Sequence, residues 1–593
     1  MHLPVRAVAG AFAVALVAGC ASPGARLHAL LDEAWEAQMR WSPTWATSLG
    51  GHRYDDRLAD LSLAAQGRRV EELRGFQARL AGIPRETLSD EDRLNGLLFE
   101  HHVETQLTDL QSGQHLIPVN QLGGPHLGLP LILVSHPFRN AGDYANYLSR
   151  LRAFPGQVEQ AIACMREGIR TGFVAPRLTV EPTLEQMQSL MAADPDTNEL
   201  YKPLLDKPNT LKPAESVEID ALIRMAIAEE VVPAYQRLHD FVRDVYLPAC
   251  RETVGIWDVP GGEAIYNRVV ERYTTTALTP EEIHQIGLDE LERIGAEMDD
   301  IRRQQGFDGT LPEYLKHLRG DPRYRAPSGA WLLQEYQAIL ERTEPRLGEL
   351  FGHLPQAPCI VKELEPFRAA SAPAAYYNAA ALDGSRPGFF YVNTSELQER
   401  VIYTTEALTY HEAVPGHHLQ FMLDAENESR PTFRRHVYIS AYSEGWALYA
   451  EGLGAELGGY TDPLQRFGRL TYDAWRAGRL VVDTGLHRFR WTRAQAIAFM
   501  EEHTGLARFN IEREVDRYIA WPGQALAYKI GELRIRELRA AAEERLGDRF
   551  DVRAFHDRVL GDGGLPLDIL TERVKDWICR QAPAQERQAT TAR

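Results

Sequence analysis

Apolar residues recur at every third or fourth position through ten long segments of this 593-residue chain. This spacing places them on one face of an α-helix and leaves the charged residues between them on the other face. One segment begins at Thr279-Pro280-Glu281-Glu282, where Thr279 and Glu282 have the spacing of a capping box and Pro280 suits the first turn. The pattern predicts a mainly α-helical protein, with helices over residues 24–48, 87–112, 141–170, 214–247, 279–304, 329–351, 433–457, 464–488, 492–504 and 523–547.

Two segments depart from this pattern. Residues 115–138 are broken by prolines and glycines around one apolar run, 129–134, and we expect an ordered loop with one strand there. Residues 359–394 contain three strand-like pieces, and Gly384 lies between the last two, which favours a hairpin. The sequence therefore predicts a small β-sheet over residues 359–361, 375–377 and 389–392.

The first residues resemble a targeting signal rather than part of the fold. Residues 1–19 have the layout of a signal peptide, with the positively charged Arg6 near the N-terminus. The apolar run 7–17 that follows is too short to span a bilayer as a stable helix. The small residues that follow, with Cys20 directly after them, resemble the lipobox of bacterial lipoproteins, in which the cysteine is lipidated. Ala21 stands where that family places an aspartate for inner-membrane retention. We therefore expect an exported lipoprotein anchored in the outer membrane, on its periplasmic or surface side; the alternative is an ordinary signal peptide.

The rest of the chain predicts a single helical domain over residues 20–580, in one or two lobes, and a polar tail over 581–593. Its net charge of −18 argues against a nucleic-acid partner, because affinity for nucleic acid comes largely from neutralising phosphates. Four cysteines remain after Cys20, too widely spaced for a zinc ribbon, and we expect buried free thiols at Cys164, Cys250, Cys359 and Cys579. The sequence makes no prediction of the oligomeric state.

The segment that carries chemistry begins with His411-Glu412, inside the range 370–545 where we expect the functional site. In the familiar zinc helix a second histidine follows four residues after the first, and the glutamate beside the first acts as the base. Here that fourth position is Pro415, which cannot bind a metal. The next candidates are the adjacent His417 and His418.

A regular helix would not bring either candidate to the metal. His417 would lie about 120° around the helix from His411, and His418 would lie about 10 Å along its axis. Proline and glycine are the residues that distort helices, so a bulge at Pro415-Gly416 can place His417 where the second ligand is needed. We therefore favour His417 over His418 as a metal ligand.

A catalytic zinc site usually takes a third protein ligand. Glu444 lies 33 residues after His411 and shares a helix face with Glu451, seven residues further on. The alternative for either glutamate is an exposed surface residue. Burial is favoured by the aromatic residues around them, Tyr442, Trp446 and Tyr449.

These two runs resemble the bacterial domain-of-unknown-function family 885, whose members are often predicted lipoproteins. The resemblance extends over nearly the whole mature chain, including residues 43–50, 279–294, 479–487 and 517–531. The family is similar to the gluzincins, mostly helical zinc peptidases with two histidines and one glutamate on the metal. The resemblance implies a gluzincin-like fold, a small sheet next to the zinc helix and one zinc ion per chain. The ligands it implies are His411, His417 and Glu444, and the general base it implies is Glu412.

Two pairs of residues can support such a site. Asp483 and His487 lie one helical turn apart, and a carboxylate there can orient a zinc-bound imidazole from behind; the alternative is an ordinary surface pair. Tyr518 and Tyr528 flank a Pro-Gly-Gln turn, and a tyrosine hydroxyl that faces the metal can donate to an oxyanion. We prefer Tyr528; the alternative for each is a core tyrosine with a satisfied hydroxyl.

Further residues are expected around the metal or the substrate. We place His418 and Gln524 there, and Arg517 can pair with a substrate carboxylate or form a structural salt bridge. The strand over residues 388–394 is expected to be an edge strand that binds the substrate backbone, with polar contacts from Arg386 and Asn393. The alternative is plain hairpin packing.

The leading hypothesis is a zinc metallopeptidase that acts on short or unfolded peptides, with Glu412 as the general base. Two alternatives belong to other classes. One is a zinc hydrolase acting on a non-peptide amide. The other is an envelope lipoprotein that binds peptide or envelope material around a non-catalytic zinc, which would require a fourth protein ligand such as His418.

Overall fold

The computed structural model describes residues 22–192, 198–205, 207–364, 373–380 and 386–581. The predictions for the signal peptide, for Cys20, for Gly384 and for residues 582–593 lie outside these ranges. The described part confirms the mainly α fold, because the chain is 72% helical and carries one small three-stranded sheet. The four cysteines that follow Cys20 are free, as predicted; Cys164, Cys250 and Cys359 are also buried, but the prediction of burial is wrong for Cys579, which is exposed on the last helix.

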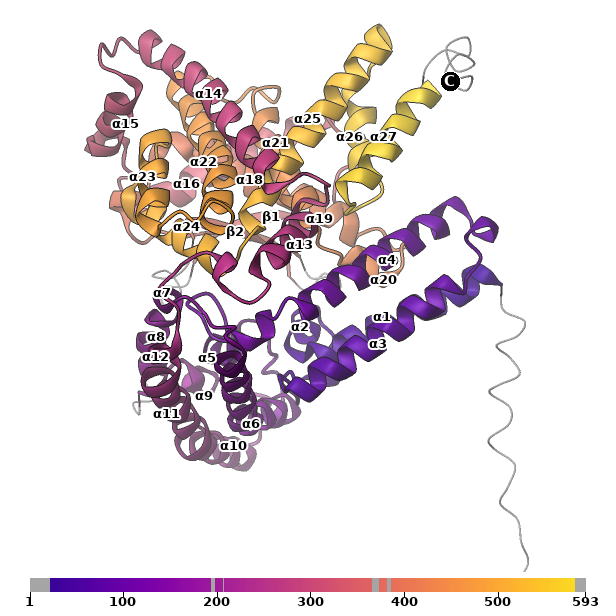
Figure 1. Ribbon diagram of the computed structural model, residues 1–593, viewed down its shortest axis with the longest axis vertical. Helices are drawn as coiled ribbons and strands as arrows, with labels where there is room; N and C mark the ends of the chain where they lie inside the picture. Colours follow the sequence, from indigo (N-terminus) through magenta and orange to yellow (C-terminus); the bar gives the residue numbers. More distant parts are fainter. Residues whose placement is uncertain (1–21, 193–197, 206, 365–372, 381–385, 582–593) are drawn as a thin grey trace, which may run out of the picture.

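The first part of the chain forms the lower half of the molecule in Figure 1. Residues between 119 and 250 build their own hydrophobic core, which includes Phe154, Tyr235 and Leu238. The helices of this half are α1 (Pro23–Trp41), α2 (Pro43–Ser48), α3 (Leu63–Ala81), α4 (Asp90–Gln111), α5 (Pro125–Leu131), α6 (Ala141–Thr171), α7 (Arg177–Val180), α8 (Pro182–Leu190), α9 (Lys202–Leu205), α10 (Pro213–Ala226), α11 (Val232–Phe241) and α12 (Leu247–Ala249).

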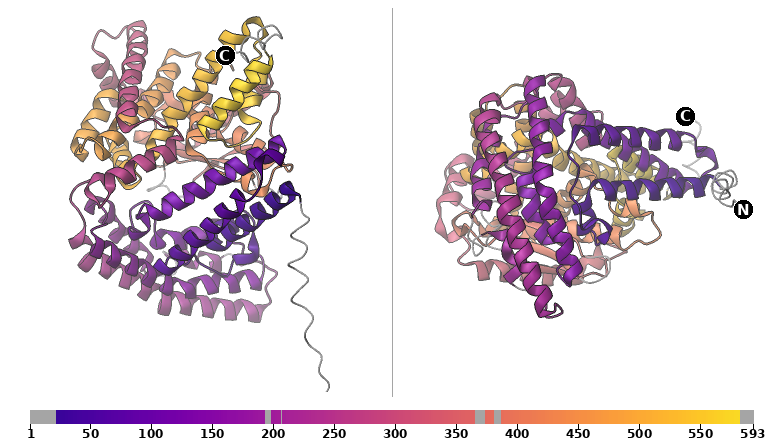
Figure 2. Two further views of the ribbon diagram at one scale, coloured as in Figure 1. Left: turned by 45° about the vertical axis from the view of Figure 1, so that its right-hand side comes forward. Right: turned by 90° about the horizontal axis from the view of Figure 1, so that it is seen from below.

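The second part forms the upper half, coloured magenta to yellow in Figures 1 and 2. Its hydrophobic core continues into α1, α3 and α4, so these N-terminal helices share a core with the second part of the chain. Its helices are α13 (Gly262–Thr274), α14 (Pro280–Gln304), α15 (Leu311–Gly320), α16 (Gly329–Thr343), α18 (Thr405–Glu412), α19 (His417–Ala425), α20 (Thr432–Arg435), α21 (Ser440–Leu453), α22 (Pro463–His487), α23 (Arg493–His503), α24 (Arg508–Ala520), α25 (Ala527–Leu546), α26 (Val552–Leu560) and α27 (Leu567–Gln581).

The helix start predicted at Thr279 is confirmed, because α14 begins at Pro280 with Thr279 as its capping residue. The Thr279 hydroxyl accepts a hydrogen bond from the backbone N–H of Glu282, and the Glu282 carboxylate accepts one from the backbone N–H of Thr279, which closes the expected capping box of α14. The prediction for the apolar run 129–134 is wrong, because it forms the end of α5 and a 3₁₀ turn rather than a strand. Pro125 starts α5 after Gly124, whose φ of 137° favours glycine, and a run of six apolar residues cannot by itself distinguish helix from strand.

The small sheet consists of β1 (Cys359–Glu363), β2 (Ala375–Asn378) and β3 (Gly388–Val392), in the order β1-β3-β2. The predicted hairpin is present, since β2 and β3 pair antiparallel with Tyr377 opposite Phe390. The expectation that the strand over 388–394 is an edge strand is wrong: β3 is central, because β1 pairs with its other side in parallel. Its backbone is therefore already hydrogen-bonded on both sides, and β3 cannot add a substrate strand.

Two long helix pairs form the support for the site: α21 packs along α25, and α14 packs along α22. The first pair crosses at Gly445 and Gly531, where a Cβ on Gly445 would lie 2.5 Å from the Gly531 backbone. Only glycine permits this approach, which fixes α21 at the residue next to Glu444. None of the described helices is long and apolar enough to cross a membrane.

The buried side chain of Lys529 forms ion pairs that connect three of these helices. The Lys529 ammonium on α25 lies 2.6 Å from Asp473 on α22, 2.9 Å from Glu290 on α14 and 2.8 Å from Glu532. Burial opposes the charge of Lys529, but these carboxylates outweigh burial and raise its pKa above the usual value. The charged network thus specifies how α25 sits on α14 and α22.

Candidate metal centre

The helix that carries His411 does not continue to His417. α18 ends at Glu412, the peptide bond between Val414 and Pro415 is cis, and α19 begins at His417. The chain turns so tightly that a Cβ on Gly416 would lie 1.9 Å from the carbonyl oxygen of His411, so the position accommodates only glycine. The expected distortion at Pro415-Gly416 is therefore present, as a full break between two helices rather than as a bulge within one.

This break brings two imidazoles together, and α21 adds a carboxylate. His411 Nε2 lies 3.7 Å from Glu444 Oε2, and His417 Nε2 lies 3.4 Å from the same oxygen. One ligand atom from each residue lies within 4.8 Å of the other two, and all three residues are buried. Ligand atoms of a tetrahedral zinc ion, with bonds of about 2.0–2.1 Å, lie roughly 3.3 Å apart, so this trio can hold such an ion.

The electrostatics of the trio favour a positive charge at its centre. Burial opposes protonation of His411, but the nearby carboxylate of Glu444 and the hydrogen bond to Glu451 outweigh burial and raise its pKa to about 9. Burial would raise the pKa of Glu444, but its interactions with His411 and His417 hold it well below the usual value. Three buried acceptor groups that converge in this way need either protons or a metal ion to compensate them.

A second carboxylate fixes the orientation of His411. Glu451 Oε1 lies 2.9 Å from His411 Nδ1, so the imidazole donates through Nδ1 and points the lone pair of Nε2 at the trio. Arg476 lies 3.5 Å from the same carboxylate, and the hydroxyl of Tyr460 donates to the Glu451 backbone. Glu451 could be recognised from the sequence, because it shares a helix face with Glu444. The sequence prediction nevertheless gave the role of orienting a zinc-bound imidazole to other residues.

That role was expected of Asp483 with His487, and this expectation is wrong. Asp483 accepts hydrogen bonds from the Tyr266 hydroxyl at 2.6 Å and from the Gly523 backbone at 3.0 Å. His487 accepts one from the Ile256 backbone through Nδ1 and donates through Nε2 to a backbone carbonyl. Both side chains are fully buried and hold α22 to its neighbours, so neither faces a metal ligand.

His418 points away from the trio, as the preference for His417 requires. Its Nδ1 accepts a hydrogen bond from the Tyr377 hydroxyl at 2.8 Å, and its Nε2 donates to the carbonyl of Ala357 at 3.0 Å. Burial lowers the pKa of His418 to about 4, so the ring is neutral and both nitrogens are used. His418 therefore joins α19 to β2 and to the segment before β1, and it does not provide a fourth ligand.

Glu412 is the last residue of α18 and is buried beside the trio. Its charge contributes to the raised pKa of His411, which places the carboxylate next to that imidazole. Sequence reasoning missed Tyr438, whose hydroxyl donates to Glu444 Oε1 at 2.7 Å. Tyr438 lies in the connection between α20 and α21, so the single helix predicted over residues 433–457 is wrong at this point, and no motif spacing singles Tyr438 out.

The two candidate tyrosines have different surroundings. Tyr528 is half-buried; burial raises the pKa of its hydroxyl, and the nearby charge of Glu444 raises it further. The Tyr518 hydroxyl is buried in the core, where it accepts hydrogen bonds from Trp475 and Arg479 at 3.0 Å and donates to Glu514 at 2.8 Å. Of the two, Tyr528 is the one whose hydroxyl is affected by the charge of Glu444.

The remaining predicted residues lie around these groups. Arg517 donates to Gln524 at 2.7 Å and pairs with Glu514 at 2.9 Å, so it has the structural salt bridge that was the alternative interpretation. Asn393 is buried. Its side chain accepts a hydrogen bond from the backbone N–H of Ser395 and donates one to the carbonyl of Pro373, so it stabilises the turn after β3. Arg386 lies over the ring of Phe389 at 5.8 Å, before β3. The structure does not bring Arg386 or Asn393 to the trio.

Comparisons with known proteins agree with this architecture. The bacterial protein family of unknown function DUF885 matches residues 43–574. A predicted lipoprotein from Colwellia psychrerythraea has 30% sequence identity and a TM-score of 0.89, over 94% of this chain and 99% of its own. A predicted lipoprotein of unknown function from Shewanella oneidensis has 20% identity and a TM-score of 0.70, over 93% of this chain and 99% of its own, and supports the fold alone. Curated proteins give no match. The chain therefore belongs to the bacterial family DUF885.

Proposed function

We propose that this protein is a zinc-dependent metallopeptidase that hydrolyses peptide bonds in short or unfolded peptides. The observation that carries the proposal is the convergence of His411, His417 and Glu444 within 4.8 Å, with a glutamate, Glu412, directly beside them. Two histidines, one glutamate and an adjacent glutamate are the groups that a hydrolytic zinc site of this class uses. Zinc bound there would supply Lewis acidity toward the scissile carbonyl and toward a water.

The residues of the chain have separable roles in such a reaction. Glu412 would accept a proton from the attacking water and deliver it to the leaving amine. Tyr528 would donate a hydrogen bond to the oxygen that becomes negative, and Glu451 would hold His411 in one orientation. This division of roles is similar to that of the gluzincins.

The arrangement favours catalysis over a structural metal. A structural zinc site is usually closed by a fourth protein ligand, and His418 was the candidate for that position. Both nitrogens of His418 are engaged elsewhere, and three ligand residues, without a fourth, group together in the described ranges. A site with three protein ligands leaves a position for water, which a non-catalytic binding protein does not need.

Zinc content and peptide turnover test the proposal together. The purified mature protein should contain one zinc ion per chain and should cleave a mixed peptide library. Glu412→Gln should abolish cleavage and keep the zinc, because Glu412 is not a ligand; His417→Ala should lose both. Stoichiometric zinc without cleavage of any peptide would refute the peptidase, and cleavage of non-peptide amides alone would support the other zinc hydrolase.

We also propose that the mature chain is anchored in the outer membrane through a lipid on Cys20. The similar structure from Colwellia psychrerythraea, at 30% identity, is described as a predicted lipoprotein, which supports the interpretation of the N-terminal sequence. Cells that express the protein should incorporate labelled palmitate into it, and Cys20→Ser should abolish the label. Recovery of the label in the inner-membrane fraction would contradict the predicted location.

A further inference from the structure

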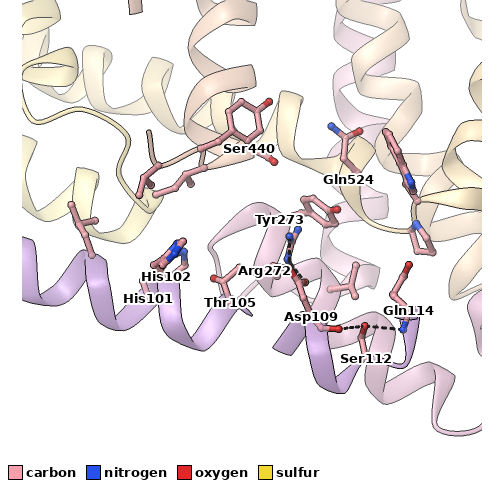
Figure 3. Close-up of a pocket in the computed structure, with 17 residues that line it drawn as sticks. His101, His102, Thr105, Asp109, Ser112, Gln114, Arg272, Tyr273, Ser440 and Gln524 are labelled. Atoms are coloured by element: carbon pink, nitrogen blue, oxygen red, sulfur yellow. Dashed lines mark hydrogen bonds and ion pairs between the residues drawn. The ribbon is translucent and has the colours of Figure 1, made fainter. Parts of the chain in front are cut away.

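A cavity of about 460 Å³ lies between the N-terminal helix α4 and the half that carries the metal centre. Figure 3 shows His101, His102 and Thr105 of α4 on one side of it and Ser440 and Gln524 on the other. Cavities of about 300–1,000 Å³ between helices are a common setting for ligand sites.

The cavity shares a wall with the metal centre. Tyr438 lines it, and the hydroxyl of the same side chain donates to the candidate ligand Glu444 at 2.7 Å. Gln524 also lines it, four residues before Tyr528 and in the turn that leads into α25. A molecule in this cavity would therefore lie next to the proposed reaction centre.

The charges that face the cavity compensate one another. Arg272 of α13 pairs with Asp109 of α4, with a nitrogen–oxygen distance of 2.5 Å. Burial lowers the pKa of His101, and it lowers the pKa of His102 to about 4, so both imidazoles are neutral at neutral pH. The cavity thus offers no uncompensated charge to an acidic or basic group.

Two large aromatic side chains remain uncovered in the cavity. Tyr438 is 53% exposed and Trp521 is 42% exposed, although most aromatic residues of the chain are buried in the cores. Tyr273 lines the same space beside Arg272 (Figure 3). Aromatic surface that is exposed inside a cavity is typical of positions that contact a ligand, because its burial contributes to binding.

We propose that this cavity binds an uncharged apolar or aromatic residue of the peptide substrate, next to the bond that is cleaved, and that Tyr438 and Trp521 form its contact surface. The proposal rests on the proposed peptidase function and adds a substrate preference to it. It also gives α4 a role, since this N-terminal helix closes the side of the cavity opposite the metal centre.

Binding to the inactive Glu412→Gln protein tests the preference without turnover. The probes are two fluorescein-labelled pentapeptides of alanine with a single central residue, Phe in one and Asp in the other. The zinc-loaded protein should bind the Phe peptide at least tenfold more tightly, measured by fluorescence anisotropy. Trp521→Ala should reduce this preference about tenfold, and Trp521→Phe should keep most of it.

Two further variants separate the cavity from general effects. Thr105→Trp adds bulk from α4 and should weaken binding of the Phe peptide about tenfold. Phe509→Ala removes a side chain of α24 that is 44% exposed and does not line the cavity, and it should change nothing. Equal affinity for the two peptides, or an undiminished preference in Trp521→Ala and Thr105→Trp, would overturn the proposal.

The outcomes distinguish this proposal from the proposed function. Cleavage of the peptide library by the wild-type protein, without a preference that depends on Trp521, would leave the peptidase and remove the cavity as its subsite. Tight binding of the Phe peptide by the zinc-loaded protein, without cleavage of any peptide, would remove the peptidase and keep the binding site.

Discussion

The hydrogen bond between Glu451 and His411 gives the most direct test of the metal centre. The two atoms lie 2.9 Å apart, both side chains are buried, and the contact orients the imidazole that faces Glu444. Glu451→Gln keeps an acceptor oxygen but removes the charge, whereas Glu451→Ala removes both. Partners behind a metal ligand typically contribute 10- to 100-fold to metal affinity. We expect zinc affinity to fall about tenfold in the Gln variant and about 100-fold in the Ala variant, or about 1.4 and 2.7 kcal/mol.

Competition with a chromophoric chelator measures these affinities, and thermal unfolding in excess chelator measures the metal-free protein. The second measurement is needed because Glu451→Ala also leaves Arg476 without the carboxylate that lies 3.5 Å away. A matched control is Glu456→Gln, which removes a glutamate paired with Arg539 at the surface and should leave zinc affinity unchanged. If Glu451→Ala binds zinc as tightly as the wild type, Glu451 has no part in orienting the ligand.

Three further predictions concern stability and turnover. Lys529→Met should destabilise the fold by about 3–5 kcal/mol in urea unfolding, because it leaves buried carboxylates without their cation. His556 is buried and neutral with a pKa lowered to about 4, so it binds fewer protons folded than unfolded. His556 alone should therefore contribute a loss of stability of about 3 kcal/mol as the pH falls from 6.5 to 4, and His556→Gln should lose about that much less than the wild type over this range. Tyr528→Phe should lower kcat about 100-fold at unchanged zinc content, whereas Tyr518→Phe should lower stability instead; the reverse pattern would exchange their roles.

Periodicity predicted most of the long helices because a helix that buries one face must repeat its apolar residues. It failed where this signal is weak. The apolar run 129–134 is as compatible with a strand as with a helix, and the glycine and proline that precede it start α5. Likewise, β3 could be recognised as a strand from its composition, but its central position depends on β1, more than twenty residues away in the sequence.

In the candidate site, the sequence predicted which residues take part better than it predicted where their side chains point. The residue types and the family resemblance identified the trio of His411, His417 and Glu444. The Pro-Gly pair predicted a distortion there, but as a bulge rather than as the break that brings the trio together. Spacing alone could not tell which way a side chain points. Asp483 and His487 occupy one helix face as expected, but that face meets Tyr266 and the backbone of Ile256 rather than a metal ligand.

The relative positions of the three candidate ligands depend on close backbone contacts beside them. His411 and His417 are held at their separation because Gly416 lies against the carbonyl oxygen of His411, where a Cβ does not fit. Glu444 is held because Gly445, the next residue, lies against Gly531 in the same way. Backbone contacts of this kind cannot relax as side-chain packing can, so they fix the ligands before any metal binds. Preorganised ligands lower the free-energy cost of binding a metal, which gives a reason for the glycines at 416 and 445, beside the two halves of the trio, although glycine weakens a helix.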